Sequence, residues 1–406
     1  MGDSSGKKLV LCASKDFLFS VFALVIYNGV LQLVIYPGLS SRMGAEAFGT
    51  VLYLISAVSI MGAGFGTAAS YSRMVAKKDR TQENGDYNIF LLLVSGISVV
   101  VSLVTLLLLK ELTIALYAQL LILMIITVYR YYADVEYRMT IRFVDYFLFF
   151  TAVASGYIIG LLIYPMSKSW AVTIFMGELF GIIYTLVRGS IFRAPFFRLS
   201  SSFRENIKSS WIISLSNLLS ALILNSDRIL LRLMVGAREV TIFYTASLIG
   251  KIVAMLTTPL NGIIISYFTN YKIKLNKTVF GLICAATALL SFIGATVCTF
   301  VSMFFVKLMY PEVFSEASKL FFLANLGQIL YFISGSLMVI VMSFTREKLQ
   351  LVINVIYVSG FILVVIPATW ISGLSGMAVG LVIVNFGRLI VTSIFGIIRI
   401  DKNSTG

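Results

Sequence analysis

Long runs of apolar residues recur from one end of the chain to the other, and polar residues gather in short segments between them. A helical run of about 20 residues is long enough to cross a bilayer core of about 30 Å. The strands of a membrane β-barrel would instead alternate apolar and polar positions over about 10 residues. The pattern therefore predicts an all-α membrane protein that crosses the bilayer many times.

The apolar runs predict twelve membrane spans, with boundaries uncertain by a few residues. The spans are expected at residues 17–38, 46–72, 89–109, 112–133, 147–166, 170–188, 211–235, 241–268, 279–303, 317–343, 351–371 and 376–398. The three tryptophans, Trp170, Trp211 and Trp370, fall at predicted span ends, where amphipathic rings prefer to lie. The polar first residues lead into a full-length span without a small-residue cleavage site, so no cleavable signal peptide is expected.

The composition agrees with this pattern, because 59% of the residues are hydrophobic and only 12% are charged. A net charge of +14 could indicate nucleic-acid binding, but most Lys and Arg lie in short loops, as the positive-inside rule expects of cytoplasmic segments. The cations expected on the outer side are few: Arg42, Lys110, Lys168, Arg238, Lys307 and Lys319. We therefore expect both termini on the cytoplasmic side and no nucleic-acid partner.

Residues that could hold a cofactor are scarce. The chain has no histidine, and Cys12, Cys284 and Cys298 are not spaced as metal ligands. No glycine-rich phosphate-binding loop is present, so ATP hydrolysis is not expected. The sequence predicts neither a metal site nor a cofactor.

A basic loop separates the sixth and seventh predicted spans, and it divides the chain into two predicted lobes. We expect an N-terminal lobe at residues 1–190, a linker at 191–210 and a C-terminal lobe at 211–406. Six spans in each lobe give both the same orientation, as parallel repeats require. A faint echo supports the division, since LSSRMGAEAFGTVLY (39–53) and LRLMVGAREVTIFY (231–244) each place Gly-Ala and an acidic residue in a short outer turn.

Once the cations near span ends are assigned to the adjoining loops, four cations remain within predicted spans: Arg228, Arg232, Lys251 and Arg388. On a helical wheel of the seventh span, the polar residues lie within about 80° of one another. They are Ser210, Ser214, Asn217, Asn225, Arg228 and Arg232. A charge facing lipid at the bilayer centre would cost roughly 2.5–3.5 kcal/mol, so the stripe must face protein or water.

The depth of the polar residues predicts a shared central site. Lys251, Arg388, Glu178 and Asn28 lie near the middle of their spans, on both halves of the chain. The two deep carboxylates, Asp227 and Glu178, cannot neutralise four cations. The surplus suits a multiply charged anion, and the predicted cationic cavity contains Arg228, Lys251, Arg388, Arg232, Asn28, Asn217 and Asn225.

Structural roles are alternatives for several of these residues. Asp227 with Arg228, or Glu178 with Lys251 or Arg388, could be ion pairs that hold helices together. Arg232 near the outer end of its span could extend to the interface. In the second span, Gly62 and Gly66 are expected to allow close helix packing.

The segment YPGLSSRMGAEAFG (36–49) resembles a signature of bacterial polysaccharide and O-antigen unit flippases. The matching residues are Pro37, Arg42, Gly44, Glu46, Phe48 and Gly49. SDRILL (226–231), with Gly236, Tyr244 and Ala246, resembles the start of the second half in the same family, although Thr241 stands where that family usually has glycine. Glu46 also has a simpler interpretation as a charge at a helix start.

These flippases belong to the multidrug/oligosaccharidyl-lipid/polysaccharide (MOP) exporter superfamily. The resemblance implies twelve helices in two six-helix lobes around a V-shaped cavity, in a bacterial inner membrane. It implies a substrate in which an O-antigen or capsule repeat unit is linked to undecaprenyl pyrophosphate. A polysaccharide polymerase and other assembly proteins of lipopolysaccharide biosynthesis would then be partners, with membrane lipids around the chain.

The predicted function is transfer of the lipid-linked oligosaccharide from the cytoplasmic to the periplasmic leaflet by alternating access. An ion gradient is the expected driving force, with Asp227 and Glu178 as candidate coupling groups. A drug/cation antiporter of the same superfamily is an alternative, although no carboxylate lies between Phe17 and Gly38 in the first span. A polysaccharide polymerase or ligase is a second alternative, although such envelope enzymes have a large outer loop. We predict a transporter and not an enzyme.

Overall fold

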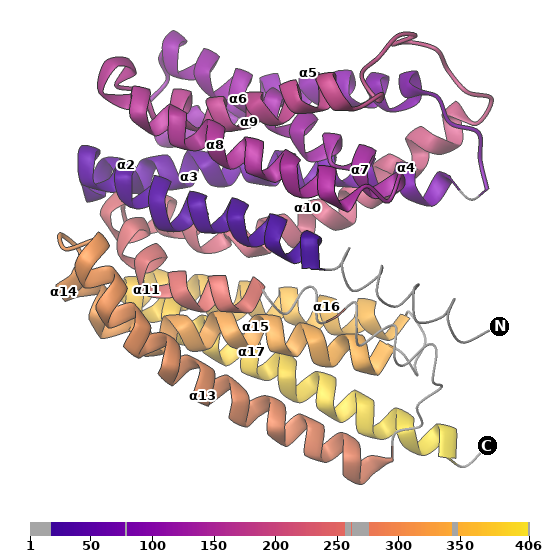
Figure 1. The fold of residues 1–406 in the computed structure, drawn as a ribbon. Coiled ribbons are helices and arrows are strands. Elements are labelled where there is room, and N and C mark those ends of the chain that lie inside the picture. Colours follow the sequence, from indigo (N-terminus) through magenta and orange to yellow (C-terminus); the bar gives the residue numbers. More distant parts are fainter. Residues whose placement is uncertain (1–17, 78, 256–260, 262–275, 343–347, 405–406) are drawn as a thin grey trace. The chain divides into compact units, whose positions relative to one another are not determined.

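The computed structural model describes residues 18–77, 79–255, 261, 276–342 and 348–404, and every regular element in them is a helix (Figure 1). Ten helical stretches are long and apolar enough to cross a membrane. They are Leu18–Met43, Ala45–Ala76, Asn84–Leu109, Ile114–Met139, Phe143–Ser167, Trp170–Arg188, Phe203–Met234, Lys277–Met309, Phe314–Met342 and Val352–Ile398. The prediction of an all-α, multi-pass membrane protein is therefore confirmed.

The ten stretches are compatible with the twelve predicted spans. The eleventh and twelfth predicted spans lie in one helical stretch that is broken at Gly373, where φ is 54° and ψ is −127°. Glycine accepts this conformation because it has no Cβ, and Trp370 lies exposed just before the break. Helix α11 (Ala237–Met255) begins the eighth predicted span, and the rest of that span, apart from residue 261, lies outside the described residues. The predicted N-terminal polar segment also lies outside them.

The chain forms two compact units. The first contains the residues through Arg42 together with Val51–Ile229, and the second contains Met43–Thr50 together with the residues from Leu230 onward. The division therefore falls within α3 (Ala45–Met61) and α10 (Phe203–Met234), and not in the basic loop at 191–210. The predicted lobes of residues 1–190 and 211–406 describe a grouping of the membrane spans, and this grouping stays a prediction.

Packing explains why most of α10 groups with the first unit. The ring of Trp211 lies 5.9 Å from that of Phe65 and 5.1 Å from that of Phe90. A Cβ placed on Gly64 would lie 2.4 Å from the side chain of Leu218. These contacts attach the first half of α10 to the helices of the first unit.

The first unit contains the N-terminal helices. Besides parts of α3 and α10, they are η1 (Leu31–Ile35), α2 (Tyr36–Met43), η2 (Gly62–Gly66), α4 (Thr67–Ala76), α5 (Asn84–Leu109), α6 (Ile114–Ala133), α7 (Val135–Met139), α8 (Phe143–Ser167) and α9 (Trp170–Arg188). Helix α5 packs against α6, α6 packs against α9, and α9 packs against α8 (Figure 1). A Cβ on Gly156 or Gly160 of α8 would lie 2.5 Å from a backbone oxygen of α9, so small residues bring the two backbones together.

The predicted glycine contact in the second span is confirmed. Residues 62–66 form a π-helical turn, η2, that packs on α6. A Cβ on Gly62 would lie 2.6 Å from the Tyr131 ring, and one on Gly66 would lie 2.4 Å from the carbonyl oxygen of Val128. This close approach fixes the part of α6 that carries Arg130.

The second unit is built around α15. Its elements from Ala237 onward are α11, α13 (Lys277–Met309), α14 (Phe314–Ala317), η3 (Ser318–Leu320), α15 (Phe321–Met342), α16 (Lys348–Gly360), η4 (Phe361–Val365) and α17 (Ile366–Ser404). Helix α15 packs against α11, α13 and α17. The backbone N–H of Gly250 in α11 donates to the side-chain oxygen of Asn325 in α15, at 2.6 Å. Because Gly250 has no side chain, the two helices can approach closely enough for this bond.

Candidate functional site: charged residues within the membrane helices

A buried ion pair lies inside the first unit. Arg130 on α6 and Glu178 on α9 each expose only 3% of their side chains. The Arg130 Nε lies 2.5 Å from one carboxylate oxygen of Glu178, and its Nη2 lies 3.2 Å from the other. This two-point geometry gives the pair both strength and a fixed orientation.

Tyrosines complete the surroundings of this pair. The hydroxyl of Tyr157 donates to Glu178 at 2.6 Å, and Arg130 donates to the hydroxyl of Tyr27 at 3.0 Å. The Arg130 guanidinium carbon also lies 4.0 Å from the centre of the Tyr131 ring, which is a favourable cation–π position. The charges are thus compensated and hydrogen-bonded within the unit, as a buried ion pair requires.

The local sequence makes room for the pair. Gly181 lies three residues after Glu178, and a Cβ there would lie 3.0 Å from the Cγ of Arg130. A larger residue would push the arginine stem away from α9. The glycine therefore positions the guanidinium against the carboxylate.

Glu178 was predicted as an ion-coupling group, with a structural pair to Lys251 or Arg388 as the alternative. The structure pairs it with Arg130, and its role in ion coupling stays a prediction. Arg130 was not expected at this site, because it lies close to the end of the fourth predicted span, where cations were assigned to the cytoplasmic loop. Helix α6 continues to Ala133, so Arg130 lies inside it. Its position on a tyrosine-rich stretch, YRYY, was the available signal.

A second missed arginine is Arg73 on α4, which is 8% exposed. Its guanidinium donates to the hydroxyl of Tyr132, and to the side-chain oxygen of Asn84 at 2.8 Å. It also lies 5.2 Å from the centre of the Tyr87 ring. Arg73 was assigned to the loop after the second predicted span, and it instead ties α4 to α5 and α6.

The predicted cations of α10 divide between the two units. Arg228 is half-buried in the first unit, donates to the hydroxyl of Ser56 at 3.4 Å and acts electrostatically on Tyr36. Asp227, its neighbour in sequence, is 3% exposed. Arg232 is half-buried in the second unit.

The predicted polar stripe of α10 faces the protein at its N-terminal end. Ser210 and Ser214 are buried and donate to the carbonyl oxygens four residues earlier. Asn217 is half-buried. Asn225 and, in the first span, Asn28 are half-buried as well, and each side chain donates to a carbonyl oxygen of its own helix at 2.9 Å.

Arg388 on α17 has a different environment from Arg130. Its guanidinium carbon lies 5.1 Å from the centre of the Tyr331 ring and 5.0 Å from that of the Tyr357 ring. Its Nη1 donates to the carbonyl oxygen of Tyr331 at 3.4 Å. Within the described part of the chain, Arg388 forms no ion pair with a carboxylate. Two aromatic faces therefore hold a cation whose charge no carboxylate of the described residues cancels.

The remaining predicted cation, Lys251 on α11, is half-buried in the second unit with Arg232 and Arg388. The other residues of the predicted cavity and the two candidate coupling groups lie in the first unit: Asn28, Glu178, Asn217, Asn225, Asp227 and Arg228. Each unit thus contains its own set of polar groups, and a single site that uses both sets remains a proposal.

A family profile described as polysaccharide biosynthesis protein matches residues 17–271. The chain belongs to this family. The match covers more than half of the chain and extends over parts of both units. No curated protein sequence matches the chain.

Solved structures confirm the fold that the resemblance implies. An inward-facing multidrug resistance transporter of the MATE family, in the MOP superfamily, is 14% identical, with a TM-score of 0.65 over 94% of this chain and 95% of that chain. An outward-facing transporter of the same description is 15% identical, with a TM-score of 0.60 over 97% of both chains. A MOP superfamily transporter from Pyrococcus furiosus, described as having a binding pocket of reverse polarity, is 16% identical, with a TM-score of 0.55 over 97% of this chain and 96% of that chain. The polysaccharide biosynthesis protein therefore has a MOP-type fold.

The family-like motif at 36–49 acts structurally at the start of α3. Gly44 has a φ of 82°, which favours glycine. A Cβ on Gly49 would lie 1.7 Å from the carbonyl oxygen of Ala237, so only glycine fits there. Phe48 is fully buried, with its ring 6.2 Å from that of Tyr244. The two echoing Gly-Ala turns of the sequence therefore meet within the second unit.

The other motif residues lie around this turn. Pro37 is buried, and Arg42 donates to the carbonyl oxygen of Leu161 in the first unit at 2.6 Å. Glu46 is exposed in the first turn of α3, as a charge at a helix start should be. Thr241, which departs from the family pattern, donates to the carbonyl oxygen of Ala45 at 2.6 Å. The departure from glycine therefore adds a bond to this turn.

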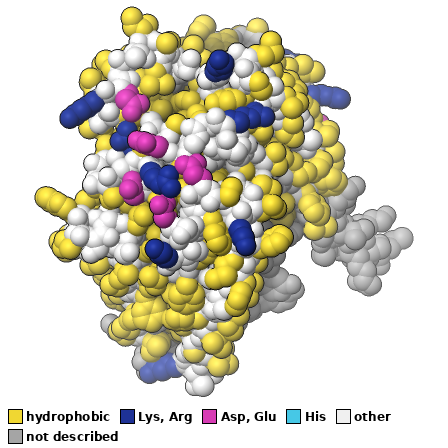
Figure 2. All heavy atoms as spheres, turned by 90° about the vertical axis from the view of Figure 1, so that its left-hand side faces the viewer, with side chains coloured by type: hydrophobic (Ala, Val, Ile, Leu, Met, Phe, Trp, Pro, Cys, Tyr) yellow, Lys and Arg dark blue, Asp and Glu magenta, His cyan; other side chains and the backbone are white. Residues whose placement is uncertain are grey.

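Two acidic side chains, one in α14 and one just before it, form contacts with the same turn. Glu312 accepts from the backbone N–H of Ala45 and from Arg238, both at 3.1 Å. Arg238 also reaches Glu316 at 3.2 Å. Figure 2 shows that acidic and basic side chains gather on this end of the molecule, with hydrophobic side chains around them. Exposed ion pairs of this kind contribute little individually, so their main effect is to orient the turn.

Proposed function

We propose that this chain is a flippase that moves a polyprenyl-pyrophosphate-linked oligosaccharide from the cytoplasmic to the periplasmic leaflet of a bacterial inner membrane. The oligosaccharide is an O-antigen or capsule repeat unit on undecaprenyl pyrophosphate. The chain works by alternating access, with both termini in the cytoplasm. Its family and its MOP-type fold support a transporter over an enzyme.

The observation that carries the proposal is the state of Arg388. A cation at mid-depth in a membrane helix is costly unless it serves a partner or a ligand. Its environment among the described residues offers two tyrosine rings and a carbonyl oxygen but no carboxylate. A lipid-linked pyrophosphate, which carries more than one negative charge, supplies the missing counter-charge.

The other predicted site residues are assigned to the same substrate. Arg228 and Lys251 join Arg388 in holding the pyrophosphate, and Arg232 acts at the outer end of the path. The side-chain amides of Asn28, Asn217 and Asn225 offer hydrogen bonds to the glycan. The prenyl chain remains in the lipid throughout.

An ion gradient drives the transfer, and Asp227 is the coupling group that we favour. Glu178 is the weaker candidate because both of its carboxylate oxygens already accept bonds from Arg130, and one also accepts from Tyr157. A carboxylate in that arrangement can exchange an ion only after the pair opens. A polysaccharide polymerase is the expected partner that consumes the transferred units.

Deletion of the gene tests the proposal. Cells that lack the chain should accumulate lipid-linked oligosaccharide on the cytoplasmic leaflet and lose surface glycan, and a plasmid copy should restore both. Surface glycan that persists while sensitivity to cationic drugs rises would favour an antiporter instead.

In vesicles that contain the purified chain, an uncoupler should slow the appearance of the glycan on the opposite face. Unchanged flipping would contradict ion coupling.

A further inference from the structure

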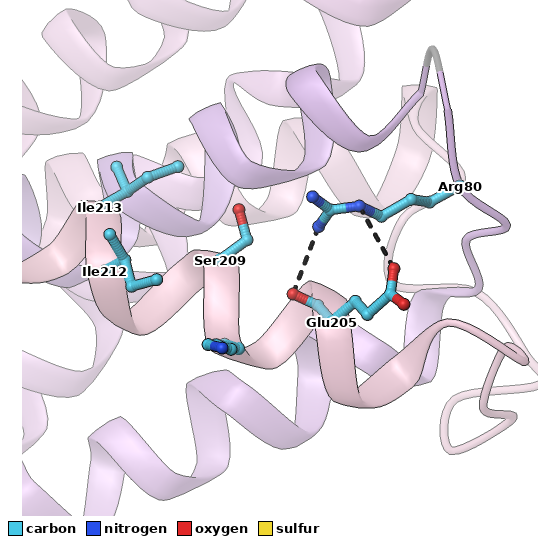
Figure 3. A pocket seen from close by; sticks show the side chains of 6 residues that line it. Arg80, Glu205, Ser209, Ile212 and Ile213 are labelled. Carbon is cyan, nitrogen blue, oxygen red and sulfur yellow. Dashed lines mark hydrogen bonds and ion pairs between the residues drawn. The ribbon is translucent and has the colours of Figure 1, made fainter.

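A cavity of about 350 Å³ lies in the first unit, beside the beginning of α10. Figure 3 shows it from close by. Six residues line it: Arg80, Glu205, Lys208, Ser209, Ile212 and Ile213. Five of them come from α10, and Arg80 comes from the loop between α4 and α5. None of these residues is among those assigned to transport.

Arg80 closes one side of this cavity. Its Nη1 donates to the carbonyl oxygen of Glu205 at 3.3 Å, and its Nε lies 3.6 Å from the Glu205 carboxylate (Figure 3). The Arg80 side chain is still 31% exposed. The guanidinium is therefore oriented by these bonds and keeps donors for a ligand.

The loop that carries Arg80 is hydrogen-bonded to α10 and to the residues just before it. The buried Asn206 donates to the carbonyl oxygen of Thr81 and to the carboxylate of Asp86, both at 3.0 Å. Asp86 also accepts from the backbone N–H of Ser200 at 2.9 Å. The loop and the first turn of α10 thus form one hydrogen-bonded structure, so the cavity is a built feature of the fold.

The cavity has a polar part and an apolar part. Lys208 is exposed, and it forms no ion pair within the described residues. Together with Arg80 it outweighs the single acid, Glu205, by one formal positive charge. One turn further along α10, Ile212 is 61% exposed, and the exposed Leu215 and Leu219 continue its face. The sequence therefore passes from cations to an apolar stripe within about one helical turn.

This order matches the boundary of a bilayer. Cationic side chains favour the headgroup level, where basic residues close to the membrane attract anionic lipids, and isoleucine and leucine favour the acyl region. Trp211 lies between the two parts in sequence, at the level that tryptophan prefers. The basic loop at 191–210 is adjacent and marks this end as cytoplasmic under the predicted orientation.

We propose that this cavity binds the phosphodiester headgroup of an anionic phospholipid of the surrounding bilayer. Arg80 and Lys208 contact the phosphate, the Ser209 hydroxyl donates a hydrogen bond to it, and one acyl chain lies along Ile212. The single net positive charge of the cavity suits one phosphodiester charge better than the multiple charges of a pyrophosphate. The site is independent of the proposed transport function.

Fluorescence quenching by brominated lipid tests the site. Replacing Trp170 and Trp370 by phenylalanine leaves Trp211, which lies between Ser209 and Ile212 in sequence, as the reporter. The purified full chain is reconstituted in vesicles of dibrominated phosphatidylglycerol or dibrominated phosphatidylcholine. We expect several-fold preferential quenching by the anionic lipid. Equal quenching by the two lipids would overturn the proposal.

Single substitutions test whether the preferential quenching by anionic lipid arises from the cavity. Lys208→Gln should reduce the preference roughly fivefold, because a basic residue near the surface contributes about 1 kcal/mol. Glu205→Gln should raise the preference, since it removes the only acid of the lining. Arg204→Gln removes the same charge from an exposed neighbour that does not line the cavity, and should leave the preference unchanged. Equal losses in Lys208→Gln and Arg204→Gln would overturn the proposal, because the effect would then be the charge of the whole loop.

Competition distinguishes the source of the phosphate. Millimolar inorganic phosphate should not displace the brominated anionic lipid, because it has no acyl chain. Displacement by inorganic phosphate, or by polyprenyl pyrophosphate at a lower concentration than phosphatidylglycerol, would overturn the assignment to a bilayer phospholipid. None of these measurements uses transport, so their failure would leave the proposed flippase activity untouched.

Discussion

The two units of this protein each hold an arginine among tyrosines inside a membrane helix, and they treat its charge differently. Arg130 in the first unit meets the carboxylate of Glu178 and is 3% exposed. Arg388 in the second unit meets the rings of Tyr331 and Tyr357, is half-buried and forms no ion pair among the described residues. A compensated charge stabilises the fold that contains it. A charge held by aromatic faces and a carbonyl oxygen, with no carboxylate beside it among the described residues, keeps its attraction for an anion that comes from outside.

Breaking the compensated pair should have the largest effect. Arg130→Met leaves the Glu178 carboxylate buried without its counter-charge, which should lower the free energy of unfolding by about 3–5 kcal/mol. The measurement is unfolding of the purified protein in detergent. The double variant Arg130→Met/Glu178→Met should recover most of this loss, since well-packed apolar side chains can replace a buried ion pair. A stable double variant that cannot restore surface glycan would show that the pair takes part in transport.

Removing the uncompensated charge should instead act on transport. Arg388→Gln should slow flipping in vesicles roughly 10–100-fold, since an interaction with a charged group contributes about 1.5–3 kcal/mol. The unfolding free energy should change little, because the variant leaves no carboxylate without a partner. Arg388→Lys keeps the charge and should retain part of the activity. Wild-type export by Arg388→Gln would remove this residue from the substrate path.

Removing a single tyrosine hydroxyl beside each arginine should have a smaller effect. Tyr157→Phe removes the bond to Glu178 and should lower the unfolding free energy by about 1–2 kcal/mol. Tyr357→Phe keeps the ring beside Arg388 and should change neither stability nor transport. Equal effects of the two substitutions would contradict the distinction between the two arginines.

The smallest expected effect concerns the aromatic face itself. Tyr357→Leu removes one of the two rings beside Arg388 and should weaken its positioning by about 0.5–1 kcal/mol. The apparent affinity for the lipid-linked substrate should fall a few-fold, with little change in the amount of folded protein. Tyr117→Leu, at a half-buried position of α6 where the hydroxyl donates to the carbonyl oxygen of Val99, provides a control for loss of a tyrosine outside the second unit.

The membrane fold could be predicted from the sequence because apolar length alone decides whether a helix can cross the bilayer. The glycines of the second span were predictable for a similar reason, since small residues at helical spacing indicate close packing. Arg130 lies within the predicted span 112–133, but it was not identified because cations near a span end were assigned to the cytoplasmic loop. The partner of Glu178 depends on which faces of α6 and α9 meet, and that information lies in the tertiary packing and not in the pattern of one helix.

The environment of Arg388 shows a second limit of prediction from the sequence. Its depth could be read from its distance to the ends of its span, but its contacts with Tyr331 and Tyr357 join α17 to α15 and α16. Nothing in the spacing of these tyrosines along the chain indicates that their rings meet one arginine. The charge could be predicted, and the reason that it is tolerated could not.

The assignment of Met43–Thr50 to the second unit, and of residues 211–229 to the first, has a genetic consequence. A chain cut in the basic loop would yield two polypeptides, and each would carry a segment that completes the other's fold: residues 43–50 in the first and residues 211–229 in the second. Neither fragment should accumulate alone in the membrane, whereas co-expression of both should yield a stable complex that can be purified by a tag on one. Duplication of the gene segment for one half, or its fusion to another gene, would therefore not produce a protein that folds without the other half.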